Sequence, residues 1–248
     1  AWLALIRDDV SVTVPLNTEA SVTVWCDALT TGFPTVEMDG GEGAEITLTY
    51  SEGLYFEATE TDRGFQSPKH DPETGVVLGY WDMYRANGGS ERYEPFHWRT
   101  FRYVRVKITT GAAPLTIRRF DYRFTGYPFV EKASFTSSDP SHERMWDMAW
   151  RTARLCAHET YEDCPYHEQL QYAGDTQVQC LLSYYVTGDE RLARQAIRHF
   201  DWSRDDEGLT KSRYPSMCEQ NIPGYALLWM VMVRDLSLIH ISEPTRPY

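Results

Sequence analysis

The stretch IRRFDYRFTGYPFVEKASFTSSDPSHERMWDMAWRTARLC, residues 117–156, changes its hydrophobic period partway along. Its first eight residues alternate apolar and polar side chains, as in a strand with one buried and one wet face. From about residue 139 the apolar positions recur at spacings of three and four, which indicates an amphipathic helix. Asp139 is expected to cap this helix, with Pro140 at its first position. The chain therefore divides into a β half and an α half, joined by residues 129–138.

Residues 1–128 are predicted to form an antiparallel β-sandwich. Alternating segments rich in Val, Thr and aromatic residues are separated by Gly, Pro, Asp or Asn, which is typical of strands connected by turns. HDPETG (70–75) and ANGGS (86–90) are expected to be loops. The predicted strands are VSVTV (10–14), SVTVWC (21–26), ITLTY (46–50), YVRVKI (103–108) and IRRFDYRF (117–124).

Residues 139–236 are predicted to form helical hairpins packed side by side. The first helix has an apolar face that includes Met145, Met148 and Leu155. Four helices are few to close a core, so we expect this half to be the opening part of a larger α/α-barrel domain. The predicted helices are 139–156, 175–187, a third that begins at Asp189 and runs to about Phe200, and 223–236, the last apolar on nearly all sides and therefore buried.

The N-terminus is expected to be a cut edge, and the C-terminal residues are expected to be non-native. AWLALIRDDV (1–10) reads as the middle of a longer sequence and shows no signal peptide. SLIHISEPTRPY (237–248) contains two prolines and does not continue the helical pattern. It is similar to the translated adapter sequence found at the ends of truncated metagenomic genes, so we expect residues 237–248 to be a non-native tail.

Composition excludes several classes of partner. The formal net charge of −12 argues against nucleic acid, because phosphates would be repelled, and it disfavours an anionic membrane surface. No apolar run approaches the roughly 20 residues that span a bilayer. The five cysteines are odd in number and form no CxxC pair, so we expect free thiols. Acids together with many Trp and Tyr residues suit a neutral polar ligand such as a sugar. Oligomeric state and compartment stay open.

The segment YEDCPYHEQLQYAGDTQ (161–177) interleaves acids with tyrosines. Each acid has a simple structural explanation: Asp175 as a helix N-cap, Asp163 as the cap of a short turn, and Glu168 as a solvated loop residue. Together they also suit glycosidic bond cleavage, which needs one carboxylic acid to protonate the leaving oxygen and a second carboxylate. Neighbouring carboxylates and aromatic rings would raise a carboxyl pKa toward neutrality.

Other motifs give no alternative chemistry. HEQLQ (167–171) has Gln171 where a zincin has its second histidine. The chain contains no GxGxxG, P-loop or GxSxG motif. The acidic run 205–207 is interpreted as a solvated loop. We therefore predict no metal and no cofactor.

On these residues the chain resembles the bacterial α-L-rhamnosidases, an inverting family with β-sandwich domains followed by an (α/α)6 barrel. The barrel of that family starts with a DCP…E…GD segment, matched here by Asp163-Cys164-Pro165, Glu168 and Gly174-Asp175. The likeness covers residues 45–236 well. Further similar blocks are PFHWRTFRYVRVKI (95–108), FTSSDPSHERMWDMAWRTARLC (135–156), GLTKSRYPS (208–216) and QNIPGYALLWMVMVRDL (220–236).

The resemblance implies a role for each site residue. Glu168 would be the general acid, while Asp163 and Asp175 would bind sugar hydroxyls. Tyr172 stands where the family often has a Trp against the sugar. The remaining candidates for the pocket are Tyr166, Arg213 and Tyr214.

Two departures from the family pattern affect the expected activity. The family has Arg residues shortly before and after the acid, whereas this chain has Tyr166-His167 and Gln169 there, which affects the sugar contacts. The family's general base is a Glu farther downstream, beyond the end of this chain. We therefore expect the 248-residue chain to be inactive alone.

The resemblance implies hydrolysis of terminal α-L-rhamnosyl units on an oligosaccharide or glycoside. Two alternatives remain: an (α/α)6 hydrolase or lyase for a different sugar, and a non-catalytic carbohydrate-binding sandwich. The position of the acids in the helical half weighs against the second.

Overall fold

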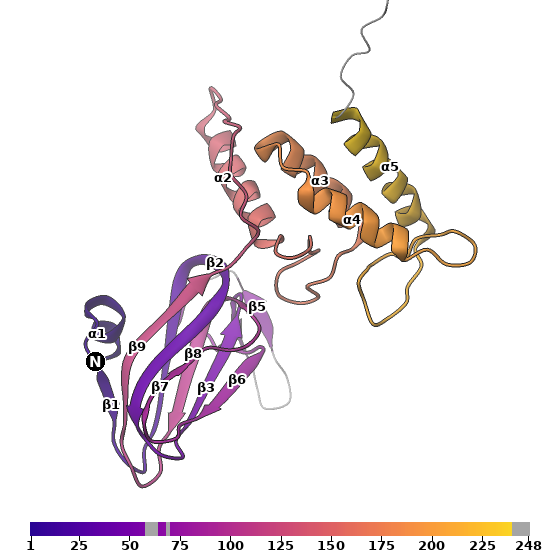
Figure 1. The fold of residues 1–248 in the computed structure, drawn as a ribbon. Helices are drawn as coiled ribbons and strands as arrows, with labels where there is room; N and C mark the ends of the chain where they lie inside the picture. Colours follow the sequence, from indigo (N-terminus) through magenta and orange to yellow (C-terminus); the bar gives the residue numbers. More distant parts are fainter. Residues whose placement is uncertain (58–63, 68–69, 240–248) are drawn as a thin grey trace, which may run out of the picture. The chain divides into compact units, whose positions relative to one another are not determined.

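The computed structural model describes residues 1–57, 64–67 and 70–239. The chain forms two compact units, residues 1–125 and residues 126–248 (Figure 1). The first unit holds the strands and the second holds the long helices. The predicted fold class, an antiparallel β unit followed by helices, is thereby confirmed. The predicted division of the chain into residues 1–128, 129–138, 139–236 and 237–248 stays a prediction.

The β unit contains the five strands predicted from alternation, together with elements that alternation did not reveal. A short helix, α1, precedes the strands and closes one edge of the core with Leu5, which is buried. The helix and strands are α1 (Trp2–Asp8), β1 (Val12–Val14), β2 (Glu19–Gly40), β3 (Glu45–Ser51), β4 (Leu54–Phe56), β5 (Phe65–Ser67), β6 (Trp81–Arg85), β7 (Ser90–Tyr93), β8 (Arg99–Thr109) and β9 (Leu115–Phe124).

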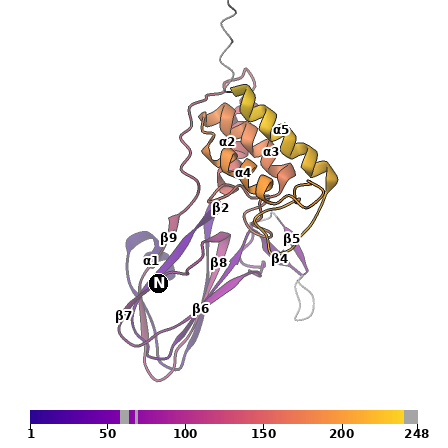
Figure 2. The same ribbon diagram turned by 45° about the vertical axis from the view of Figure 1, so that its right-hand side comes forward.

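The long strand β2 connects the two layers of this unit. The antiparallel strand order is β1-β9-β2-β8-β3-β6, with β7 also paired to β2 and with β4 and β5 forming a separate pair. The first part of β2, through Trp25, pairs with β8, while the part from Gly32 to Gly40 pairs with β9. The register shifts between Trp25 and Thr30, and such bulges bend a strand. Figures 1 and 2 show β2 curving between the layers.

Alternate residues of the strands fill the core of the β unit. On β3, Ile46, Leu48 and Tyr50 are fully buried, while the intervening Glu45, Thr47 and Thr49 are half-buried. This period of two is what the sequence displays, because successive side chains of a strand point to opposite faces. The same cluster contains Val36, Met38, Phe101, Val104, Val106, Ile108, Leu115 and Ile117.

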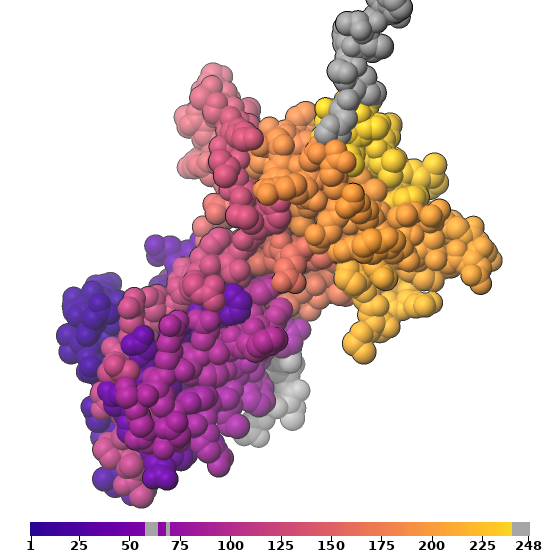
Figure 3. Space-filling view, viewed as in Figure 1, coloured from indigo at the N-terminus to yellow at the C-terminus, as the bar shows by residue number. Residues whose placement is uncertain are grey.

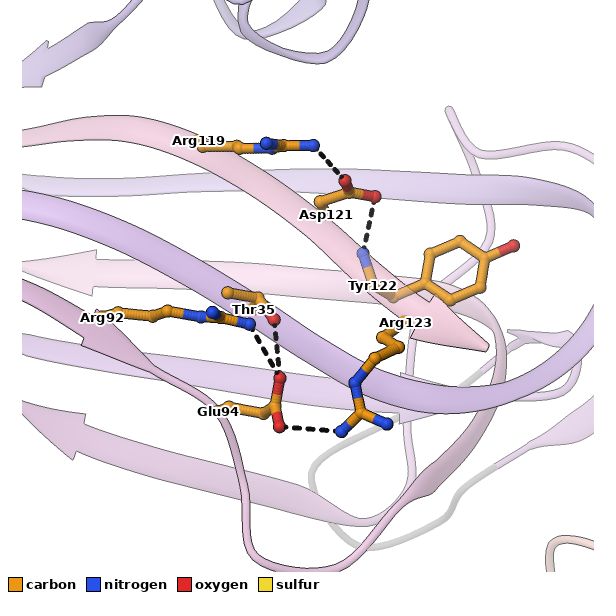
Figure 4. Close-up of polar contacts among 7 residues, drawn as sticks. All are labelled: Thr35, Arg92, Glu94, Arg119, Asp121, Tyr122 and Arg123. Atoms are coloured by element: carbon orange, nitrogen blue, oxygen red, sulfur yellow. Dashed lines mark hydrogen bonds and ion pairs between the residues drawn. The ribbon is translucent and has the colours of Figure 1, made fainter. Parts of the chain in front are cut away.

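A charged network lies on the outer surface of the β unit. The carboxylate of Glu94 accepts hydrogen bonds from Arg92 at 3.1 Å, Arg123 at 3.0 Å and the hydroxyl of Thr35 at 3.2 Å (Figure 4). Asp121 makes similar contacts along β9. Exposed pairs of this kind contribute only about 0–1 kcal/mol each. The network therefore links β2, β9 and the residue after β7 without adding much stability.

The described part of the helical unit contains four helices, and some of their starts differ slightly from the predicted ones. The predicted cap of α2 is confirmed, because Asp139 accepts a hydrogen bond from the backbone N–H of Ser141 at 2.8 Å and Pro140 follows it. Asp189 lies two residues before the start of its helix and accepts from the N–H of Arg191 at 3.0 Å. The helices are α2 (Pro140–Leu155), α3 (Ala173–Thr187), α4 (Arg191–Trp202) and α5 (Pro223–Ile239).

Helices α3, α4 and α5 pack against one another and form one body in the space-filling view (Figure 3). Their core surrounds Phe200, which is fully buried. None of the helices in the described part of the chain is both long and apolar enough to cross a membrane. Other members of this core are Ala157, Tyr161, Ala173, Cys180, Leu192, Ala193, Ala196 and Met232.

One prediction about burial was wrong, and a second apolar helix face is exposed as well. Helix α5 is not buried on all sides, since Leu227 and Met230 are 63% and 59% exposed while Met232 is buried. On α2, Met145 and Met148 are exposed as well. The sequence pattern identifies apolar residues but does not state on which side a packing neighbour lies. In the described part of the chain, α2 and α5 therefore each expose an apolar face.

Helix α5 also ends later than predicted. It continues through Ile239, three residues beyond the predicted end at 236. The proposed artificial origin of 237–248 stays a prediction, and residues 240–248 lie outside the described part of the chain.

Candidate active site

The loop between α2 and α3 is closed by Asp163. Its backbone N–H donates to the carbonyl of Leu170 at 2.9 Å, and its carboxylate accepts from the N–H of Leu170 at 3.0 Å. Inside this closure, Gln169 has a φ of 54°, in the left-handed region that non-glycine residues rarely adopt. The Gln169 side chain donates to the carbonyl of Pro165 at 2.8 Å and so holds this turn. The loop therefore presents Glu168 in a fixed position.

Glu168 is exposed and is held by a chain of two hydrogen bonds. The hydroxyl of Tyr172 donates to Glu168 Oε2 at 2.6 Å. Arg213 Nη1 donates in turn to the Tyr172 oxygen at 2.8 Å, and its guanidinium lies 5.6 Å from the centre of the Tyr172 ring. The bond to Glu168 is the main reason why the pKa of the Tyr172 phenol is raised. Three predicted site residues are thus brought together.

A short backbone bridge explains why Arg213 reaches this loop. Tyr172 and Arg213 pair as an isolated antiparallel bridge, and the N–H of Ala173 donates to the carbonyl of Ser212 at 2.9 Å. Gln171, only 2% exposed, donates its side-chain amide to the carbonyl of Tyr214 at 2.7 Å. Sequence reasoning did not assign Gln171 to the site. Its position beside Tyr172 in the EQLQY segment was the available signal.

Asp175 belongs to the same group of acids, although not as a helix cap. The N-cap of α3 is Tyr172, and Asp175 lies in the first turn, so the predicted N-cap role is wrong. The cause is that α3 begins two residues earlier than the pattern indicated. Burial raises the pKa of the half-buried Asp175 carboxyl, and the charges of Asp163 and Glu168 raise it further. The three acids therefore share one electrostatic environment.

This raised pKa predicts that Asp175→Asn stabilises the chain near neutral pH. A raised folded-state pKa gives a stability contribution that is complete below the unfolded-state pKa and is lost as the pH rises through the folded-state pKa. At neutral pH the ionised Asp175 therefore costs stability that asparagine does not. Thermal unfolding from acidic to neutral pH should show a higher Tm for the variant at neutral pH only. Asp147→Asn, at an exposed position on α2, is the control, and a neutral-pH Tm below that of the parent chain would contradict the prediction.

Gly174 allows an aromatic ring to pack against the start of α3. A Cβ at this position would lie 2.8 Å from Cζ of Tyr225, which is closer than such atoms approach. The glycine between Ala173 and Asp175 thus gives Tyr225 of α5 access to the helix that carries the acids. Gly174, the first residue of the Gly-Asp pair in the sequence motif, therefore has a packing role.

The two remaining tyrosines among the predicted site residues lie deeper. Tyr166 is buried, with its ring edge against His167 at a centroid distance of 4.9 Å. Tyr214 is half-buried and packs against the core of the helical unit. Sugar contact by Tyr166 and Tyr214 stays a prediction.

The acidic run after α4 orders a loop. Asp205 accepts hydrogen bonds from the N–H groups of Leu209 at 2.9 Å and Glu207 at 3.1 Å, and from the Asn221 side chain at 3.0 Å. The bond from Leu209 contributes most to lowering the pKa of this carboxyl. Among the residues that the structure describes, no three His, Cys, Asp or Glu side chains are grouped so as to hold a metal ion.

The described chain thus combines an antiparallel β unit, packed helices and a group of three acids in one loop and helix start. Residues 130–236 match the family model of the bacterial alpha-L-rhamnosidase six-hairpin glycosidase domain. These residues are therefore similar to the hydrolase domain of bacterial α-L-rhamnosidases, and the resemblance predicted from the sequence is confirmed. No curated protein matches the chain.

Solved structures agree with this assignment at the level of the fold. The GH78 family rhamnosidase of Bacillus sp. GL1 is similar with a TM-score of 0.74 and 24% identity, over 91% of this chain and 22% of that one. The rhamnosidase from Klebsiella oxytoca, solved with rhamnose bound, gives a TM-score of 0.74 and 16% identity, over 92% of this chain and 46% of that one. The chain thus spans less than half the length of either protein, and the predicted sandwich followed by barrel helices is confirmed.

Proposed function

We propose that the chain forms one sandwich and the first helical hairpins of an α-L-rhamnosidase. The complete enzyme, meaning the polypeptide that continues residues 1–236 through the rest of its hydrolase domain, would hydrolyse terminal α-L-rhamnosyl bonds with inversion. The observation that carries this proposal is the Glu168 carboxylate, held by Tyr172 and Arg213 beside two further acids within the segment that matches the family. The bound rhamnose in the Klebsiella oxytoca rhamnosidase supports this substrate class.

In this proposal Glu168 is the general acid. Tyr172 donates to Oε2, so in the protonated carboxyl the proton resides on Oε1. That proton would pass to the glycosidic oxygen as the bond to the anomeric carbon breaks. Tyr172 then acts as the group that orients the acid, in place of the sugar-stacking role implied by the family resemblance.

Asp163 and Asp175 would bind the rhamnosyl hydroxyls. Ionised carboxylates accept hydrogen bonds from several donors at once. Asp163 uses one oxygen to close the loop and retains acceptor capacity on the other. Their negative charges would also stabilise the cationic character that develops at the anomeric carbon.

Inversion also needs a general base. Its carboxylate lies about 6.5–9.5 Å from the acid, which leaves space for the attacking water. The family resemblance puts this base farther along the sequence than residue 236. We therefore propose that the 248-residue chain does not turn over rhamnosides by itself.

A glycoside panel tests the proposed activity. The complete enzyme should hydrolyse 4-nitrophenyl α-L-rhamnoside and leave the corresponding glucoside, galactoside and fucoside largely intact. Proton NMR should detect β-L-rhamnose as the first product, since inversion reverses the anomeric configuration. The 248-residue chain serves as the inactive comparison. Preference for another sugar would instead support a different barrel glycosidase, and α-L-rhamnose as first product would exclude inversion.

A further inference from the structure

A polar hollow lies at the C-terminal end of α4, within the helical unit. Its volume is about 350 Å³, and its walls include Trp202, Asp206, Lys211, Arg213 and Tyr214. This volume is in the range of small-ligand sites in proteins. Arg213 and Tyr214 are candidate pocket residues from the sequence, but the acid chemistry proposed above assigns no ligand to this hollow.

The walls of this hollow are held by the loop's own hydrogen bonds. Asp205 fixes the turn at its rim, as described above. The hydroxyl of Ser203, itself buried, accepts from the N–H of Lys211 at 3.0 Å, and the Lys211 ammonium lies 3.3 Å from a Glu219 carboxylate oxygen. Arg204 pairs with Asp201 at 2.8 Å. Contacts within the chain therefore hold the walls of the hollow in place.

The side chains that line the hollow are of the types that sugar-binding sites use: an aromatic ring, hydrogen-bond donors and a carboxylate. Trp202 is 65% exposed, which is unusual for an aromatic residue of this size, and it offers a flat apolar surface to the C–H face of a pyranose. Lys211 and Arg213 supply hydrogen-bond donors, and Asp206 supplies acceptors for hydroxyl groups. A purely apolar ligand would remove water from these charged groups without offering them new hydrogen-bond partners.

Arg213 connects the hollow to the proposed acid. Its guanidinium lines the hollow and donates to the Tyr172 oxygen, which in turn donates to Glu168. The hollow therefore lies two hydrogen bonds from the carboxyl that would protonate the departing oxygen. A general acid contacts the leaving group directly, so the leaving group occupies the space beside it.

We infer that this hollow binds the leaving-group sugar, the unit to which the terminal rhamnose is attached, with Trp202 as its platform. This inference rests on the proposed rhamnosidase activity. It names the substrate class as a rhamnosyl oligosaccharide, in which a second sugar ring follows the rhamnose.

Trp202→Ala in the complete enzyme tests the inference with two ligands. The KM for a rhamnosyl-glucose disaccharide should rise about tenfold, the lower end of the effect of one lost apolar contact, while kcat stays within about twofold. The inhibition constant of free L-rhamnose should not change, because rhamnose occupies the neighbouring site. Trp202→Phe, which keeps a ring, should recover most of the lost affinity, and Tyr185→Ala, at an exposed ring on α3, should have no effect.

Two results would overturn the inference. An equal rise in the disaccharide KM and the rhamnose inhibition constant would show that the hollow holds the rhamnosyl unit. Unchanged constants for both ligands would show that the hollow binds neither. Glu168→Gln is measured in parallel to distinguish failure of this inference from failure of the proposed function. Full activity in that variant would reject the proposed function itself.

Discussion

Glu168→Gln in the complete enzyme is expected to lower kcat by about 10²–10⁴-fold on a rhamnosyl disaccharide, the usual contribution of a general acid. Glutamine keeps the size of the side chain and can still accept the hydrogen bond from Tyr172 through its amide oxygen. It cannot deliver a proton, so a sugar alkoxide would have to leave unprotonated. Steady-state kinetics on the disaccharide measures this loss.

The choice of leaving group makes this test specific to proton donation. With 4-nitrophenyl α-L-rhamnoside the leaving phenolate is already stable, so Glu168→Gln should lose much less activity on that substrate. Glu159→Gln, at an exposed position before the site loop, is the matched control and should match the parent enzyme. Equal losses on both substrates would indicate disturbed binding or folding and would remove Glu168 from the role of acid.

Phe200→Ala is expected to destabilise the helical unit by about 3–5 kcal/mol, the usual cost of truncating a buried phenylalanine. The ring is fully buried in the core shared by α3, α4 and α5. Removing it leaves a cavity that these packed helices cannot fully close. Denaturant unfolding of the 248-residue chain, followed by far-UV circular dichroism, measures the change.

Tyr185→Ala provides the comparison for this stability test, because that ring is 80% exposed on α3. It should change the free energy of unfolding by less than about 0.5 kcal/mol, as is usual at the surface. The core of the β unit is a separate cluster of residues, so its unfolding transition should stay in place in both variants. A Phe200→Ala chain as stable as the Tyr185→Ala chain would contradict the assigned core.

The regular elements were predictable because their periods are local. Strands such as β3 and β8 show alternation directly in the sequence, and the cap of α2 stands in the chain as Asp139-Pro140. Strands β4 to β7 were not predicted. They have three to five residues each, too few to display a period clearly.

The candidate site was only partly predictable, because its contacts join distant parts of the chain. Glu168 and Tyr172 are four residues apart, so a local pattern could suggest that they belong together. Arg213 is 41 residues from Tyr172, and only the backbone bridge brings them into contact. From the sequence alone, ordinary loop packing explained Arg213 at least as well as a role in the site did. Likewise, an apolar helix face such as that of α5 does not reveal where its neighbours lie.

The hydrogen-bond chain from Arg213 through Tyr172 to Glu168 has an evolutionary consequence. A tryptophan at position 172 would have no hydroxyl to donate to Glu168, and its indole N–H could not accept from Arg213. A tryptophan there would leave both Glu168 and Arg213 without this contact. Positions 172 and 213 should therefore be inherited as a pair, so that homologues with tyrosine at the first keep arginine at the second, and those with tryptophan are released from that requirement.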